Sequence, residues 1–166
     1  VMGTKRSSIG NPYETFVICD TDAWQSGIDS ALYRSVGARV LGLPRPESYF
    51  YVLGNKRASE ANGMDRKYAN LISVNIDPVH TEPSLQVEDN VYARPQGVVT
   101  VNAPTKESAK QFIEEHGAEI VGHFEIGERN RSLANSRRSS SPKLMEQFKK
   151  HTGIDMHIPA GFGRAN

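Results

Sequence analysis

Cysteine is almost absent from this sequence of 166 residues, in which Cys19 is the only one. A single thiol excludes an internal disulfide framework and a zinc site built from several thiolates. No apolar run approaches the roughly 20 residues of a membrane-spanning helix, and no charged and then apolar segment marks an export leader. The net charge of +1 gives no bulk electrostatic reason to expect nucleic acid or a charged membrane surface as a partner.

The sequence also lacks the short motifs that mark common catalytic sites. It contains no nucleophile elbow, no phosphate-cradling glycine loop, no metalloprotease helix and no nucleotide fingerprint. With 37% hydrophobic and 23% charged residues, the composition is that of a rather polar globular protein. The length favours one domain with a core of its own. These features predict a folded domain and leave its function open.

The clearest pattern lies in the middle of the chain. Residues 71–76 alternate apolar and polar side chains, which predicts a half-buried strand ended by a proline. Residues 87–93 predict a second, more polar strand, and residues 99–101 predict a third. The connection 94–97 predicts a hairpin with Gly97 in an unusual backbone conformation. The proline beside this turn places one of the two strands near a sheet edge.

Further elements are predicted on either side of this region. Residues 13–19 and 49–53 have the β-branched and aromatic composition of strands. Between them, helical spacing predicts a helix from Ala23 to about Val36, with Asp22 as its N-cap. Residues 55–68 are polar and contain a glycine, which predicts a mobile loop.

The C-terminal part of the sequence is predicted to be helical. One apolar stripe starts at Ala109, and helical character continues towards Arg138, with a kink or break expected at Gly117 because glycine is a poor helix former. A short helix is predicted for residues 142–151, with Ser141 as N-cap and a proline in its first position. Residues 154–158 alternate again and predict a last strand.

These elements predict an α+β fold, with a mixed, largely antiparallel sheet and helices packed mainly on one face. Residues 1–12 are expected to form a flexible leader and residues 13–159 a single α+β domain. Residues 160–166 are expected to form a C-terminal tail of a chain truncated from a longer protein.

Five short strings occur in a fixed order along the chain. They are Asp20 with Trp24, GLPRPE at 42–47, VNIDP at 74–78, VYARPQ at 91–96 and DMHIP at 155–159. In this order they resemble the uncharacterised bacterial envelope lipoproteins grouped as domain of unknown function 4837, over most of residues 11–159. The resemblance implies export and tethering by a lipidated cysteine upstream of Val1, hence a location in the cell envelope outside the cytoplasm. It transfers no catalytic residue and no cofactor.

The sharpest local motif is the apolar strand that ends in Asp20-Thr21-Asp22. Phosphatases with an aspartate nucleophile begin in this way: one carboxylate attacks phosphorus, the second handles the proton, and Mg2+ bridges the first to the phosphate. Such enzymes also need a threonine or valine where this chain has Trp24, and a later acidic pair where it has only Asp77. The favoured interpretation makes Asp20 a turn residue and Asp22 a helix cap.

Two proline-stiffened loops are candidates for a preorganised binding surface. Their polar residues are Arg45 and Glu47 in the first loop, and Asp77, His80 and Glu82 in the second. The alternative interpretation is that both loops only connect secondary-structure elements.

Histidine and arginine clusters are weaker candidates. His151, Asp155 and His157 could converge on a metal, but lone histidines and acids in loops are mostly solvated. His116 and His123 are expected within the long helix as structural residues. Four arginines, at 129, 131, 137 and 138, suggest a phosphate or acidic-partner patch, but helical geometry scatters them around the axis, so a solvated helix face is favoured.

We therefore expect a non-enzymatic envelope domain with a binding or structural role, whose partner is an envelope protein or component. No cofactor, metal or nucleic acid is expected, and membrane contact is expected only through the upstream lipid anchor. The alternative is a metal-dependent, phosphatase-like hydrolase using Asp20 and Asp22. A third hypothesis is that a C-terminal portion beyond residue 166 completes a site.

Overall fold

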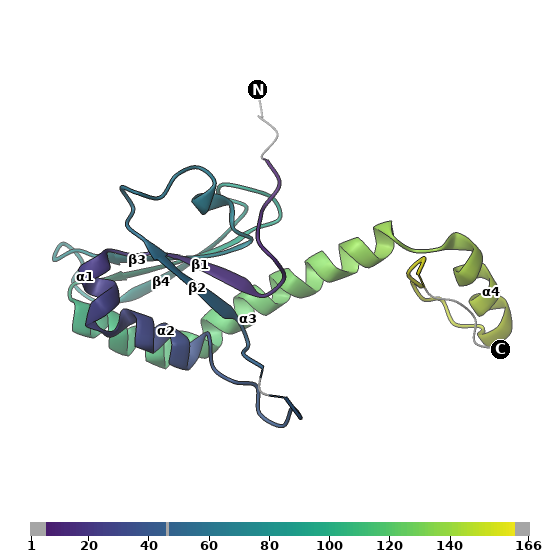
Figure 1. Cartoon of the computed structure of the whole chain (residues 1–166), viewed down its shortest axis with the longest axis horizontal. Helices are drawn as coiled ribbons and strands as arrows, with labels where there is room; N and C mark the ends of the chain where they lie inside the picture. The colour runs from purple at the N-terminus through teal and green to yellow at the C-terminus, as the bar shows by residue number, and fades with distance from the viewer. Residues whose placement is uncertain (1–5, 46, 162–166) are drawn as a thin grey trace. The chain divides into compact units, whose positions relative to one another are not determined.

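The computed structural model describes residues 6–45 and 47–161 of the chain. The chain divides into two compact units, unit 1 (Val1–Gly127) and unit 2 (Glu128–Asn166). Along the chain the structure has β1 (Glu14–Ile18), α1 (Thr21–Ala23), η1 (Trp24–Ile28), α2 (Asp29–Ser35), β2 (Tyr51–Lys56), η2 (Asp65–Lys67), β3 (Asn70–Ile76), β4 (Ser84–Asp89), β5 (Gly97–Ala103), α3 (Lys106–Arg138) and α4 (Pro142–Thr152) (Figure 1).

A five-stranded sheet in the order β2-β1-β3-β5-β4 forms the centre of unit 1. The predicted mixed sheet is confirmed, but the prediction that it is largely antiparallel is wrong. The pairs β1–β2, β1–β3 and β3–β5 are parallel, and only β4–β5 is antiparallel. The physical reason lies in the connections, since parallel neighbours need a crossover, and the segments after β1 and β2 are long enough to supply one.

The central strands are buried on both faces, which is usual for parallel sheets. In β3, Ile72 and Val74 belong to one apolar cluster, whereas Leu71 belongs to another on the opposite face. The predicted half-buried strand is therefore more deeply buried than alternation suggested. β5 pairs with β3 along its whole length, from Asn70↔Gly97 to Ile76↔Ala103.

The larger apolar cluster lies between the sheet and the helices. It joins sheet residues such as Val17 and Val99 to Leu32 of α2 and to Ile113 and Phe124 of α3. The smaller cluster, built on Phe16, Ile18, Leu71 and Val98, is covered by loop residues Ala61, Tyr68 and Val91. The prediction that the helices pack mainly on one face is confirmed, and in Figure 1 loops lie on the other side of the sheet.

The helix predicted from Ala23 to Val36 is divided into three parts. A wide π-helical turn, η1, separates α1 from α2, and Gly27 within it has a φ of 114°. This left-handed conformation suits glycine because it has no Cβ. The predicted N-cap is also wrong: Asp20 holds that position, without a side-chain capping bond, and Asp22 lies within the first turn.

The predicted hairpin exists, but its strand and loop differ from the prediction. β4 covers residues 84–89 instead of 87–93, and residues 90–96 form the connection to β5. An unusual backbone conformation was predicted for Gly97, but it is Asn90, with a φ of 57°, that has a left-handed one. Gly97 instead permits close packing, since a Cβ there would lie 3.1 Å from Nε2 of His123. β4 is an edge strand, as the nearby proline predicted.

α3 runs without interruption through Gly117, so the predicted kink or break is wrong. A Cβ on Gly117 would lie 2.3 Å from Cβ of Ser35 in α2. The glycine is therefore needed for close contact between two helices, and it does not mark a helix end.

Unit 2 contains α4, close to its predicted position. Ser141 caps it by accepting a hydrogen bond from the backbone of Leu144, and Gly153 ends it with a φ of 73°. The predicted strand at 154–158 is wrong: these residues have no regular secondary structure, and the isolated bridge Ser140↔Pro159 follows them.

The segment predicted as a flexible leader is bound, where the structure describes it, to the segments that precede β3 and β5. Ser7 and Ile9 form isolated parallel bridges with Arg94 and Tyr68. Residues 1–5 lie outside the described part, as do Pro46 and residues 162–166 of the predicted tail.

Candidate functional site

An open pocket of about 580 Å³ lies at the C-terminal ends of β1 and β2. It is lined by Asp20, Thr21, Asp22, Gln25, Arg57 and Ser59. Because β1, β2, β3 and β5 are parallel, loops that follow them share one end of the sheet, where ligands bind in many open α/β sheets. We call this cavity the strand-end pocket. It contains both residues of the predicted acidic pair.

The Asp22 carboxylate is held by Lys106, the first residue of α3. Lys106 Nζ lies 2.6 Å from Asp22 Oδ2. The side-chain hydrogen bond from Lys106 lowers the pKa of Asp22 and in turn raises the pKa of Lys106. Asp22 therefore stays ionised at neutral pH and is poorly suited to proton transfer.

Asp20 is the free acid of the pair. Its side chain forms no ion pair with another described residue, while its backbone oxygen accepts from Trp24 N at 2.8 Å. Cys19 directly precedes Asp20 in the chain and is buried. Burial, and then the negative charges of Asp20 and Asp22, raise the pKa of the Cys19 thiol to about 12. The thiol therefore remains protonated and unreactive as a nucleophile.

Arg57 reaches the pocket from the end of β2. Its Nε donates to Thr21 Oγ1 at 3.0 Å and lies 3.7 Å from Glu60. The loop that carries Arg57 is tied down by Asp65, whose two carboxylate oxygens each lie 3.0 Å from Lys56 Nζ. The segment 55–68, predicted to be a mobile loop, thus holds Arg57 in place.

Sequence reasoning missed Gln25, Arg57, Ser59 and Lys106 as residues of this site. Gln25 and Ser59 belong to segments without any motif. Lys106 could have been found only with the parallel topology, which brings the ends of β1 and β5 to the same side of the sheet.

The residues predicted as one loop surface are separated by the fold. Arg45 and Glu47 lie in the loop before β2, at the N-terminal end of the parallel strands. Asp77, His80 and Glu82 follow β3 and therefore lie at the opposite end. Asp77 Oδ1 accepts from Val79 N at 2.9 Å, so it stabilises its own turn. None of the five lines the strand-end pocket.

In the cluster of His151, Asp155 and His157 in unit 2, the carboxylate of Asp155 forms a structural ion pair. Asp155 pairs with Lys149 at 2.9 Å. In the described part of the chain, no three His, Cys, Asp or Glu residues are arranged to hold a metal ion. Of the four arginines, Arg131 pairs with Glu128 at 2.6 Å.

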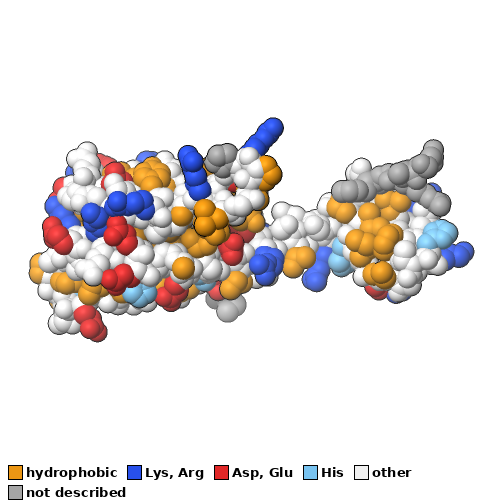
Figure 2. Space-filling model, turned by 90° about the horizontal axis from the view of Figure 1, so that it is seen from below, with side chains coloured by type: hydrophobic (Ala, Val, Ile, Leu, Met, Phe, Trp, Pro, Cys, Tyr) orange, Lys and Arg blue, Asp and Glu red, His pale blue; other side chains and the backbone are white. Residues whose placement is uncertain are grey.

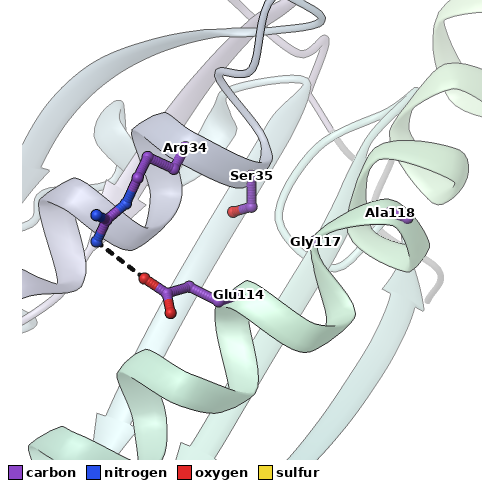
Figure 3. A pocket seen from close by; sticks show the side chains of 5 residues that line it. All are labelled: Arg34, Ser35, Glu114, Gly117 and Ala118. Atoms are coloured by element: carbon purple, nitrogen blue, oxygen red, sulfur yellow. Dashed lines mark hydrogen bonds and ion pairs between the residues drawn. The ribbon is translucent and has the colours of Figure 1, made fainter.

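A second hollow of about 380 Å³ lies between α2 and α3. Figure 3 shows Arg34 reaching across it to Glu114, at 2.9 Å, with Ser35 beside Gly117. The two charges neutralise each other and are well exposed, at 63% and 41%. This hollow follows from the helix contact at Gly117 and offers no unpaired charge to a ligand.

None of the helices, within the residues described, combines the length and apolar character needed to cross a membrane.

Comparison with known proteins corrects the family assignment. The profile of the family described as Domain of unknown function (DUF8532) matches residues 8–137, which is most of the chain. The resemblance to domain of unknown function 4837 is therefore wrong, because its five short strings were too weak to identify a family. The lipid anchor and the envelope location depended on that resemblance alone. Searches of curated proteins and of solved structures found no match. The chain belongs to the family described as Domain of unknown function (DUF8532).

Proposed function

We propose that the chain is a non-enzymatic binding domain that takes a small ligand with one positive and one negative group in the strand-end pocket. The observation that carries this proposal is the presence of opposite charges, those of Asp20 and Arg57, in one open pocket, where Arg57 is paired only with Glu60 at 3.7 Å. Asp20 makes no ion pair with another described residue. Arg57 uses Nε for Thr21, which leaves its two terminal nitrogens free to donate to an anion.

Two groups of the pocket lining, Arg57 and Asp22, are fixed before a ligand arrives, which supports binding. Thr21 holds Arg57, and Lys106 holds the carboxylate of Asp22. Fixed groups lose little conformational freedom on binding, which favours affinity. The pocket is open and polar, so we expect weak binding, with a Kd on the order of 0.1–1 mM.

The alternative is a metal-dependent hydrolase using Asp20 and Asp22. A divalent cation there would compete with Lys106, which already lies 2.6 Å from Asp22. No third acid or histidine joins the pair in the described residues. The residues present do not fit the metal that this chemistry needs, so the hydrolase remains the second candidate.

The proposal is tested by NMR titration of the full chain with free amino acids and other small zwitterions. We expect amide shifts confined to residues 20–25 and 57–59, and their loss in Asp20→Asn and Arg57→Gln. Arg34→Gln, in the hollow between α2 and α3, is the matched control and should bind normally.

Two results would overturn the proposal. The first is shifts that persist unchanged in both pocket variants. The second is Mg2+-dependent hydrolysis of a phosphate monoester that disappears in Asp20→Asn, which would establish the hydrolase instead.

A further inference from the structure

The two units carry opposite net charge. Residues 128–166 contain eight Lys or Arg and three Asp or Glu, a net charge of +5. Residues 1–127 contain 12 basic and 16 acidic residues, a net charge of −4, and the two values give the +1 of the whole chain. The near-neutral total therefore conceals a strongly basic segment of 39 residues.

Most of the positive charge on the described residues of this unit is not neutralised by ion pairs. The ion pairs among those residues are Arg131–Glu128 and Lys149–Asp155. Within the described residues, five basic side chains of unit 2 make no ion pair: Arg129, Arg137, Arg138, Lys143 and Lys150. These charges are available to an anionic partner.

Unit 2 also lacks a buried apolar core in its described part, since every fully buried apolar side chain lies at or before Phe124. In α4, Leu144, Met145 and Phe148 are only half-buried. The tail adds Ile154 and Met156, which are 59% and 45% exposed. Figure 2 shows hydrophobic side chains gathered on one face of this unit and basic side chains at the edge of the unit.

α4 is amphipathic. Successive residues turn by about 100°, so Leu144, Met145 and Phe148 share one side, while Lys143 and Lys150 lie on the opposite side. A helix of this length extends only about 16 Å, about half of the hydrocarbon thickness of a bilayer. It is suited to lie along a membrane surface with its apolar side inserted, while its long basic side chains extend from the polar side to the headgroups.

We propose that unit 2 docks on an anionic lipid surface, with the apolar side of α4 and its tail at the acyl boundary and the lysines and arginines at the headgroups. The combination of features selects this partner. Phosphates of a nucleic acid would use the basic side chains but not Phe148, Ile154 and Met156. A second copy of the chain would offer the acidic unit 1 to the basic unit 2. The net charge of −4 on unit 1 is a small excess of acids among interspersed bases, so it is a weaker match for unit 2 than a uniformly anionic surface.

Binding of the full chain to vesicles tests this docking. Phosphatidylcholine vesicles with about a third phosphatidylserine are compared by co-sedimentation with vesicles of phosphatidylcholine alone. We expect binding to the anionic vesicles only, weakening as salt is raised because salt screens the headgroup charge.

Two double variants separate the charge from the apolar contribution. Lys143→Gln with Lys150→Gln should weaken binding about thirtyfold, since each basic residue near the surface contributes about a factor of five. Ile154→Ser with Met156→Ser should weaken it about tenfold or more. Both pairs are exposed, so neither change removes a buried contact. The matched controls in unit 1, Arg45→Gln with Arg94→Gln and Leu41→Ser with Leu43→Ser, should bind as the unmodified chain does.

Three results would overturn the proposal. They are equal binding to both kinds of vesicle, equal losses in the unit 1 controls, and absence of vesicle binding together with dimerisation that Lys143→Gln and Lys150→Gln abolish. The last result would assign unit 2 to a second copy of the chain. None of these variants alters the strand-end pocket, so the outcome is independent of ligand binding there.

Discussion

Two glycines five residues apart in α3 have opposite relations to their surroundings. A Cβ on Gly117 would lie 2.3 Å from Cβ of Ser35, a distance that real side chains do not tolerate. A Cβ on Gly122 would meet nothing within 4 Å. Glycine therefore brings a packing benefit at the first position and only a loss of helix stability at the second.

We predict that Gly117→Ala lowers the free energy of unfolding by about 1–2 kcal/mol, because overpacking outweighs the better helix propensity of alanine. Gly122→Ala should raise it by about 0.5–1 kcal/mol. Urea denaturation of both variants measures the difference. Adding Ser35→Gly to Gly117→Ala should restore most of the loss. If both alanine variants are equally stabilised, α2 and α3 do not approach as closely as described.

At the scale of elements, the β4–β5 connection is fixed by one buried side chain. Gln96 is 3% exposed, and its Oε1 accepts from the backbone of Tyr92 and Ala93, at 2.8 and 3.2 Å. Its Nε2 donates to the backbone oxygens of Arg66 and Tyr68, at 2.6 and 2.8 Å. The side chain thus joins the hairpin loop to the segment that precedes β3.

We predict that Gln96→Leu, which keeps the volume but removes these four hydrogen bonds, costs about 2–4 kcal/mol, because partly buried backbone groups lose their partners. Gln86→Leu on the exposed face of β4 is the control and should change stability by no more than about 0.5 kcal/mol. Thermal or urea unfolding provides the measurement. Equal effects of the two changes would show that the loop does not depend on Gln96.

The sequence allowed most elements to be located, since alternation and helical spacing are local signals. The direction of strand pairing was not predictable in the same way, because it depends on which strands become neighbours, and alternation within one strand does not contain that information. Gly117 was misinterpreted because propensity describes an isolated helix, whereas its role depends on Ser35, 82 positions earlier in the chain.

The site was predictable only in part for the same reason. Asp20 and Asp22 follow an apolar strand and were visible as a motif. Arg57 and Lys106 reach the same region from other strands, and their relation to the acids depends on the parallel order of the sheet. A local motif thus located one side of the pocket, and topology supplied the rest.

For the whole molecule, the main feature is the division into two units. All the fully buried apolar side chains of the described residues lie between Phe16 and Phe124, in unit 1. The family match extends over residues 8–137 and so ends before α4. Unit 1 therefore contains the buried apolar core of the described residues, which is what cooperative folding requires.

We predict that a chain ending at Gly127 unfolds cooperatively, with a free energy of unfolding within about 1 kcal/mol of that of the full chain. Circular dichroism during urea denaturation checks this. A chain ending at His116 is the comparison, because it also loses Ile120, Val121 and Phe124, which are fully or almost fully buried, and it should not fold. Unfolding of the Gly127 chain under native conditions would show that unit 2 supports the core.

The position of β1 has a consequence for the nascent chain. β1 leaves the ribosome before both of its partners, since it lies between β2 and β3 in the sheet and precedes them in the chain. Its second partner is complete only at Ile76, 58 residues after Ile18. At about 5–20 residues per second, synthesis leaves the apolar run from Phe16 to Cys19 without both partners for roughly 3–12 s. During that interval β1 is an open template for pairing with other chains, and a molecular chaperone that holds it would raise the yield of folded protein.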